Sequence, residues 1–178
     1  NNVFKKGSRG IHLEGISTAN YSTGVLIQNN IFNDTYRSIN LAYEKGFTIK
    51  GNTMNEFTNA GVGLYYCTTP YNVIKNNMTS SVTTYYGMFA DNCTGSFGVI
   101  GLIANNFIQS SSNSGVYGIY FYNSSYQEVY HNSVSLTSTS TSSRAFYNSG
   151  GSNHVLKNNI LANSGAGQAY YNSTTGAI

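Results

Sequence analysis

The sequence repeats one short phrase seven times, and such a repeat restricts the chain to a small number of architectures. Each copy has a few apolar residues, then Asn-Asn or a close variant, then further apolar residues, as in Gln28–Phe32 and Lys157–Leu161. The second residue of the pair lies at positions 2, 30, 52, 77, 106, 132 and 159, so consecutive copies are 22 to 29 residues apart. This period is typical of one coil of a solenoid.

A second phrase keeps step with the first through all seven copies. Its copies are Gly10–Leu13, Ser38–Leu41, Gly61–Leu64, Gly87–Ala90, Gly118–Phe121, Ala145–Tyr147 and Ala169–Tyr171. Segments such as Val25–Gln28 and Phe47–Lys50 have a period of two, are rich in β-branched and aromatic residues, and are bounded by Gly and Asn. They are therefore predicted strands. Parallel coils about 4.8 Å apart would stack into a rod roughly 30 Å long.

The Asn pairs have a structural explanation. A tight turn between strands needs a residue at positive φ, and Asn tolerates this conformation best after Gly. In one copy Gly51 replaces the first Asn of the pair. The Asn side chains of successive coils are predicted to stack and to form hydrogen bonds along the rod axis. We therefore assign the pairs to the fold and not to a ligand site.

Composition limits the classes of function. Charged residues are 8% of the 178, the net charge is +3, and the nine basic residues are scattered. Nucleic acid is therefore not an expected partner. The 14% of aromatic residues argues against disorder. The longest apolar run, Phe97–Ala104, has eight residues. It is too short to cross a bilayer, so we expect no membrane span.

With these repeats the sequence resembles the right-handed parallel β-helix superfamily, which includes the pectate lyase-like proteins. The resemblance covers the whole chain. Gly118–Tyr122, Gln127–His131 and Val134–Leu136 are similar to the three strands of one coil, and Asn132-Ser133 is similar to its tight turn. The fold class implied is all-β, a single-stranded right-handed parallel β-helix of about seven coils, with residues 1–178 as one domain. No amphipathic cap is visible at either end, so we expect a fragment without its caps or rods that stack end to end.

The Tyr-Asn-Ser turns and the Ser/Thr/Gly loops are also similar to repeat regions of secreted bacterial surface proteins of the Bacteroidetes type. This resemblance implies an extracellular or cell-surface location. The superfamily includes lyases, hydrolases, adhesins and tail fibres, so the resemblance specifies the fold and not the function.

The acidic residues depart from the catalytic pattern of the enzymes with this fold. Those lyases hold Ca²⁺ in a carboxylate cluster, and the hydrolases need carboxyl groups roughly 5 to 9 Å apart. The six acids here fall in five coils with no stacked pair. They are Glu14, Asp34, Glu44, Glu56, Asp91 and Glu128. We therefore assign no catalytic residue, expect no cofactor and no metal site, and favour a protein without enzymatic activity.

One charged cluster is a candidate site for an acidic sugar. His12 and Glu14 alternate with apolar residues, so both are predicted to point outward from one strand. Arg9 and Arg37 precede this strand at equivalent positions in adjacent coils, so they are predicted to stack. The competing interpretation, which we prefer at this point, is a solvated charged face.

A column of aromatic residues is a second candidate site. Alternation places Tyr120 and Tyr122 outward, whereas Tyr117 is expected in a loop. Alignment of the coils on the turn that follows this strand predicts one outward column. Its members are Tyr65, Asp91, Tyr122, Tyr147 and Tyr171. Such a stripe suits the apolar faces of sugar rings. The alternative is a stack that only stabilises the sheet.

The two cysteines follow equivalent strand positions in adjacent coils. Cys67 lies five residues after Val62, and Cys93 lies five residues after Met88. The two sulfur atoms are therefore predicted within about 6 Å of each other. Two interpretations stay open: the cysteines are two free thiols, or they form a disulfide.

These observations favour a structural or adhesive rod on the cell surface that contacts a polysaccharide or cell-surface glycan through the Tyr column. Two alternatives remain. One is a fragment of a polysaccharide lyase or glycoside hydrolase whose catalytic coils are missing or degenerate. The other is a filament subunit that self-associates end to end.

Overall fold

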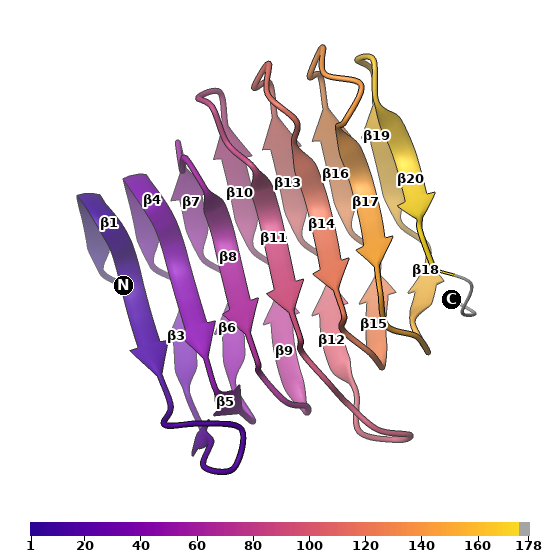
Figure 1. Cartoon of the computed structure of the whole chain (residues 1–178). Coiled ribbons are helices and arrows are strands. Elements are labelled where there is room, and N and C mark those ends of the chain that lie inside the picture. Colours follow the sequence, from indigo (N-terminus) through magenta and orange to yellow (C-terminus); the bar gives the residue numbers. More distant parts are fainter. Residues whose placement is uncertain (175–178) are drawn as a thin grey trace.

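The computed structural model describes residues 1–174, which form twenty β-strands wound into a rod and no helix (Figure 1). The strands are β1 (Val3–Glu14), β2 (Ser22–Thr23), β3 (Leu26–Gln28), β4 (Ile31–Ala42), β5 (Glu44–Lys45), β6 (Thr48–Lys50), β7 (Thr53–Asn55), β8 (Ala60–Tyr65), β9 (Tyr71–Ile74), β10 (Asn77–Ser80), β11 (Tyr86–Asp91), β12 (Gly101–Ala104), β13 (Phe107–Ser110), β14 (Tyr117–Tyr122), β15 (Gln127–Tyr130), β16 (Ser133–Leu136), β17 (Arg144–Ser149), β18 (Val155–Lys157), β19 (Ile160–Asn163) and β20 (Gln168–Asn172). In this part of the chain no helix could span a membrane.

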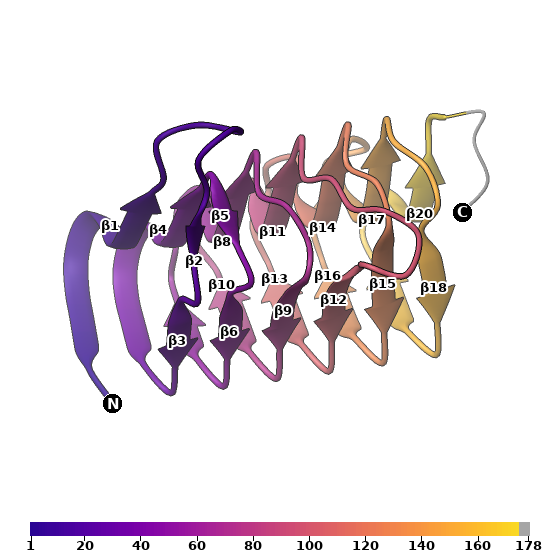
Figure 2. The ribbon, with the colours of Figure 1, turned by 90° about the horizontal axis from the view of Figure 1, so that it is seen from below.

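Each strand pairs in parallel with the strand one coil away, so the rod has three sheets that run along its length. Sheet I contains β7, β10, β13, β16 and β19, and sheet II contains β8, β11, β14, β17 and β20. β1 and β4 are long enough to contribute to both. Sheet III contains β3, β6, β9, β12, β15 and β18. In Figure 2 these strands follow one another along the rod, from β3 to β18. The predicted right-handed parallel β-helix of about seven coils is confirmed.

The core consists of columns of apolar side chains, one residue from each coil. These residues alternate with outward ones along each strand, as the period of two predicts. In sheet I the column is Phe32, Met54, Met78, Ile108 and Val134; in sheet II it is Ile39, Val62, Met88, Ile119 and Phe146; in sheet III it is Ile27, Ile49, Val73, Ile103 and Val129. Burial of each such side chain contributes roughly 1.5 to 3 kcal/mol.

The predicted Asn ladder is present at the turn between sheets III and I. Its members are Asn30, Asn52, Asn76, Asn106, Asn132 and Asn159. Each Oδ1 accepts hydrogen bonds from the backbone N–H and the Nδ2 of the Asn one coil before it, at 2.9 to 3.2 Å. The residue before each ladder Asn has a φ of 55 to 65°, which explains Gly51.

One coil corrects the predicted alignment. The residue at positive φ is Lys75, with φ 57°, and the ladder member is Asn76, not the residue at position 77. Asn77 is the first residue of β10 and pairs with Phe107 of β13. Lys75, Asn76 and Asn77 are three consecutive polar residues, and the turn is formed by the first two. A search for the Asn-Asn pair alone selects the last two, which is the wrong pair.

The two cysteines lie in adjacent coils at equivalent positions, as predicted. Thr68 and Thr94, which directly follow them, form a parallel bridge. Both thiols are free and buried. Burial raises the pKa of the Cys93 thiol well above its usual value. The neighbouring Cys93 side chain lowers the pKa of the Cys67 thiol. The predicted separation of the two sulfur atoms, within about 6 Å, stays a prediction.

We expect both thiols to be unreactive toward Ellman's reagent in the native protein, because neither sulfur is exposed and the more deeply buried thiol resists ionisation. Two thiols per chain should react after denaturation. Absorbance at the wavelength of the released thiolate measures both. Reaction of either thiol within seconds in native buffer would contradict the burial described above.

Candidate functional site

A continuous row of aromatic side chains covers the outer surface of sheet II. We call it the aromatic face. Its members are Tyr65, Tyr86, Phe89, Tyr117, Tyr120, Tyr147 and Tyr171, contributed by β8, β11, β14, β17 and β20 (Figure 1). All are half-buried except Tyr171, which is exposed.

The aromatic face is wide because two successive residues of each strand point inward. In β14 both Gly118 and Ile119 are buried, so Tyr117 and Tyr120 lie on the outer surface although three positions separate them. A Cβ on Gly118 would overlap a methyl group of Val134 in the core. β11 repeats this arrangement. A small residue at this point therefore allows each coil to present two outward columns.

The strand register defines these columns along the rod. The first contains Arg9, Arg37, Ala60, Tyr86, Tyr117, Arg144 and Gln168; the second contains His12, Asn40, Gly63, Phe89, Tyr120, Tyr147 and Tyr171; a third contains Glu14, Ala42, Tyr65, Asp91, Tyr122 and Ser149. The aromatic face thus occupies the later coils, and the N-terminal charged cluster occupies the same columns in the first two coils.

The register corrects the predicted Tyr column. Tyr65, Asp91 and Tyr122 do share a column, but Tyr147 and Tyr171 stack on Tyr120. The alignment on the following turn fails because β17 continues for two residues beyond its last aromatic residue. The second phrase, which aligns the residues before these tyrosines, predicts the observed register.

Tyr86, Phe89 and Tyr117 were missed by the sequence analysis, and Tyr117 lies in β14 and not in a loop. Strict alternation assigns Tyr86 to the inward face, and Tyr117 was expected in a loop; Phe89 lies outward between Met88 and Ala90, as alternation requires. The signal that could have identified them is the Gly that directly follows Tyr86 and Tyr117, because a small residue permits two consecutive inward positions.

The rings stack on one another both along the rod axis and within one strand. Tyr120 and Tyr147 are nearly parallel, with 4.7 Å between centroids and 5° between planes. Tyr86 stacks on Phe89 at 4.6 Å, and Phe89 stacks on Tyr120 at 5.2 Å. Since stacked rings cover each other's faces, the groups left for a ligand are mainly ring edges and phenol hydroxyls. Burial raises the pKa of Tyr120 to about 12, so its hydroxyl is protonated at any physiological pH.

A guanidinium group lies at each end of the aromatic face. Arg37 lies over the Tyr65 ring, 5.0 Å from its centroid, and Arg144 lies over the Tyr171 ring at 5.0 Å. Arg144 donates hydrogen bonds to the carbonyl oxygens of Thr141 and Ser143. Within residues 1–174 the ion pair is formed by His12 and Glu14, so neither the Arg37 nor the Arg144 guanidinium has a carboxylate partner.

The predicted N-terminal cluster forms a chain of internal contacts. Arg9 pairs with Arg37 in register, as predicted. His12 Nε2 lies 3.2 Å from a carboxylate oxygen of Glu14, and Asn40 Nδ2 lies 2.9 Å from His12 Nδ1. Arg37 donates to Asn40 Oδ1 at 2.8 Å. These groups bind one another, which favours the structural interpretation; binding of an acidic sugar here remains a prediction.

The later end of the aromatic face contains a hollow of about 230 Å³. Tyr117, Tyr147 and Tyr171 line it together with Ser142 and Arg144. Three phenol rings, a hydroxyl and a guanidinium without a carboxylate partner among residues 1–174 therefore surround one space. This arrangement offers hydrogen-bond donors and a positive charge to a polar, anionic ligand.

Comparison with known protein families gives one match. Residues 1–99, more than half of the chain, match the family described as periplasmic copper-binding protein (NosD), whose members are right-handed parallel β-helices. Searches of curated proteins and of solved structures gave no match.

The family description names copper, for which imidazole nitrogen and thiolate sulfur are suitable ligands. Within residues 1–174 no three His, Cys, Asp or Glu side chains lie close enough together to hold a metal ion. The His154 ring is buried, and burial lowers its pKa to about 4. The thiols of Cys67 and Cys93 form an isolated buried pair. The described residues therefore do not fit a copper site with three protein ligands.

Proposed function

This chain belongs to the NosD family, and on that premise we propose that it is an exported β-helix rod that binds a glycan along its aromatic face. The family is described as periplasmic, which makes an exported protein the starting point. The observation that carries the proposal is the register of the aromatic face, because its columns repeat once per coil over several coils.

The spacing between successive coils suits an extended polysaccharide. Neighbouring parallel strands lie about 4.8 Å apart, which is close to the length of one sugar unit in an extended chain. A glycan that lies along the rod therefore meets one aromatic ring of the second column per unit, in the order Phe89, Tyr120, Tyr147 and Tyr171. Phenol hydroxyls and ring edges supply hydrogen bonds and apolar contacts, which is the combination that sugar rings require.

The charges on the aromatic face favour an acidic glycan. Arg37 and Arg144 lie near its two ends and have no carboxylate partner among the described residues. In the later coils, the acidic residue among the described members of the three columns is Asp91. Burial raises the pKa of its carboxyl group. A carboxylate or sulfate on the ligand can accept two parallel hydrogen bonds from a guanidinium, which Lys cannot offer.

Titration with acidic and neutral polysaccharides, followed by tyrosine fluorescence or calorimetry, tests the proposal. We expect Tyr147→Phe, which keeps the stack and removes one hydroxyl, to weaken binding about fivefold. Arg144→Gln should weaken binding of acidic glycans about tenfold and leave neutral glycans unaffected. Lys157→Gln on sheet III makes the same change in net charge and is the matched control.

Absence of binding to every glycan tested, or equal binding by Arg144→Gln and Lys157→Gln, would reject a glycan site on sheet II. In that case the stacked rings act only to stabilise the sheet. Enzymatic activity and end-to-end self-association stay predictions that no contact within residues 1–174 supports.

A further inference from the structure

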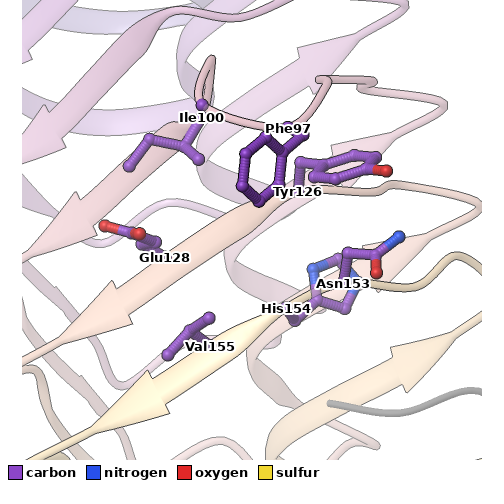
Figure 3. A pocket seen from close by; sticks show the side chains of 8 residues that line it. Phe97, Ile100, Tyr126, Glu128, Asn153, His154 and Val155 are labelled. Carbon is purple, nitrogen blue, oxygen red and sulfur yellow. The ribbon is translucent and has the colours of Figure 1, made fainter.

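A second hollow, of about 500 Å³, lies beside sheet III and is separate from the aromatic face. The loop between β11 and β12 passes over β15 and the segment before β18, and the hollow lies beneath it (Figure 3). Its walls are largely apolar and aromatic. The residues that matter here are Phe97, Ile100, Tyr126, Glu128, His154 and Val155.

The loop holds Phe97 at the tip of a tight turn. Ser96 and Val99 exchange backbone hydrogen bonds of 2.9 and 3.2 Å, and Gly98 has a φ of 76°. The loop is anchored on both sides: the Thr69 hydroxyl donates to the carbonyl of Val99, and Gly95 packs directly against Tyr126. The Phe97 side chain is 95% exposed although it lines the hollow. A large apolar ring held in water by a well-defined turn indicates a surface that is available to a ligand.

The charge in this hollow is negative. Glu128 supplies a carboxylate, and no Lys or Arg lines the space. Burial raises the pKa of Tyr130, and the neighbouring Glu128 carboxylate adds to this effect. Burial lowers the pKa of His154 to about 4, so its ring is neutral at pH 7. The hollow therefore differs from the rest of a chain whose net charge is +3.

Tyr126 adopts a backbone conformation that disfavours a bulky side chain. Its φ is 59°, and Asn153, which occupies the equivalent position in the next coil, has a φ of 60°. Asn tolerates this conformation better than Tyr does. The Tyr126 ring lies at the hollow at the expense of local backbone strain, and such strain is commonly retained at binding sites.

We propose that this hollow binds a small organic cation, an ammonium group carried on an apolar body, with the Glu128 carboxylate against the ammonium and the rings of Phe97 and Tyr126, on the other side of the hollow, against the apolar body. Aromatic rings bind an apolar body through dispersion contacts and through the burial of apolar surface. A single carboxylate in apolar surroundings adds charge complementarity. The apolar walls formed by Ile100 and Val155 suit the body of the ligand.

Calorimetric titration with phenethylammonium chloride tests the proposal, and 2-phenylethanol is the neutral probe of similar shape. We expect the wild-type protein to bind the ammonium about tenfold more tightly than the alcohol. Glu128→Gln should abolish this preference. Glu14→Gln, which makes the same change in charge on β1, should preserve it. Equal binding of the two probes by the wild type, or an unchanged preference in Glu128→Gln, would overturn the proposal.

A second variant separates binding from folding. Tyr126→Asn places at this position the residue type that holds the same φ in the next coil, so its melting temperature should equal or exceed that of the wild type. Its affinity for phenethylammonium should fall about fivefold, because one ring of the site is lost. A stable variant with unchanged affinity would exclude Tyr126 from the site and contradict the proposal.

Discussion

Replacing Asn106 by alanine should lower the free energy of unfolding by about 4 kcal/mol, because several buried polar groups lose their partners at once. Asn106 Oδ1 accepts hydrogen bonds of 3.0 Å from the backbone N–H and from Nδ2 of Asn76. Its Nδ2 donates to the Val73 carbonyl at 2.8 Å and to Asn132 Oδ1 at 3.0 Å. All these groups are inside the rod, where an unpaired donor or acceptor costs about 1 to 3 kcal/mol. Urea unfolding followed by circular dichroism measures the change.

Asn2→Ala is the matched control, because Asn2 is exposed and contacts Asn30, the first member of the ladder. The side chain of Asn2 donates one hydrogen bond to Asn30 Oδ1, and the backbone N–H of Asn2 donates to the same atom. Removal of the side chain leaves Asn30 Oδ1 with a partner and exposes nothing buried. The expected loss is below about 0.5 kcal/mol. Equal losses in the two variants would show that the stability of the ladder does not depend on buried hydrogen bonds.

Gly118→Ala should destabilise the protein by about 2 to 3 kcal/mol, although it adds only one methyl group. The new Cβ would overlap a methyl group of Val134 and lie 2.5 Å from the carbonyl oxygen of Ala145. The first neighbour is a core side chain and the second is backbone, so the strand must shift. Thermal and urea unfolding report the effect.

The comparison for this variant is Gly7→Ala in β1. The atom nearest to a Cβ on Gly7 is the carbonyl oxygen of Arg9, at 4.0 Å, which is an ordinary contact. Gly7→Ala should therefore be neutral or slightly stabilising, because alanine restricts the unfolded chain more than glycine does. If Gly118→Ala is as stable as Gly7→Ala, the small residue is not required where the strand bends, and our explanation of the two outward columns is wrong.

The sequence predicts the fold well because one coil repeats with little variation. The Asn pairs predict both the turn and the ladder. The first residue of each pair must adopt a positive φ and the second must supply a stacked amide, and Asn suits both requirements, so the sequence shows two Asn in a row. The second phrase also predicts the register of sheet II, where Ile119 pairs with Phe146. The error at position 77 arises where a third polar residue extends the doublet.

The candidate sites were predicted less well, for two physical reasons. First, strict alternation does not describe strands in which a small residue allows two successive inward positions, so Tyr86 and Tyr117 were not recognised as outward. Second, the hollow beneath Phe97 depends on how a long loop folds back on residues one and two coils away. Phe97 was part of the longest apolar run in the sequence, but that run divides between an exposed turn and β12.

The equal spacing of the coils along the aromatic face has a consequence for motion. A polymer bound along sheet II meets another aromatic ring of the second column after moving by one coil, so neighbouring positions along the axis share this contact. Such a chain can slide in steps of about 4.8 Å without dissociating, because only its terminal unit changes partners at each step. The rod would then act as a track, on which affinity rises with the number of coils covered while each single contact stays weak enough to exchange.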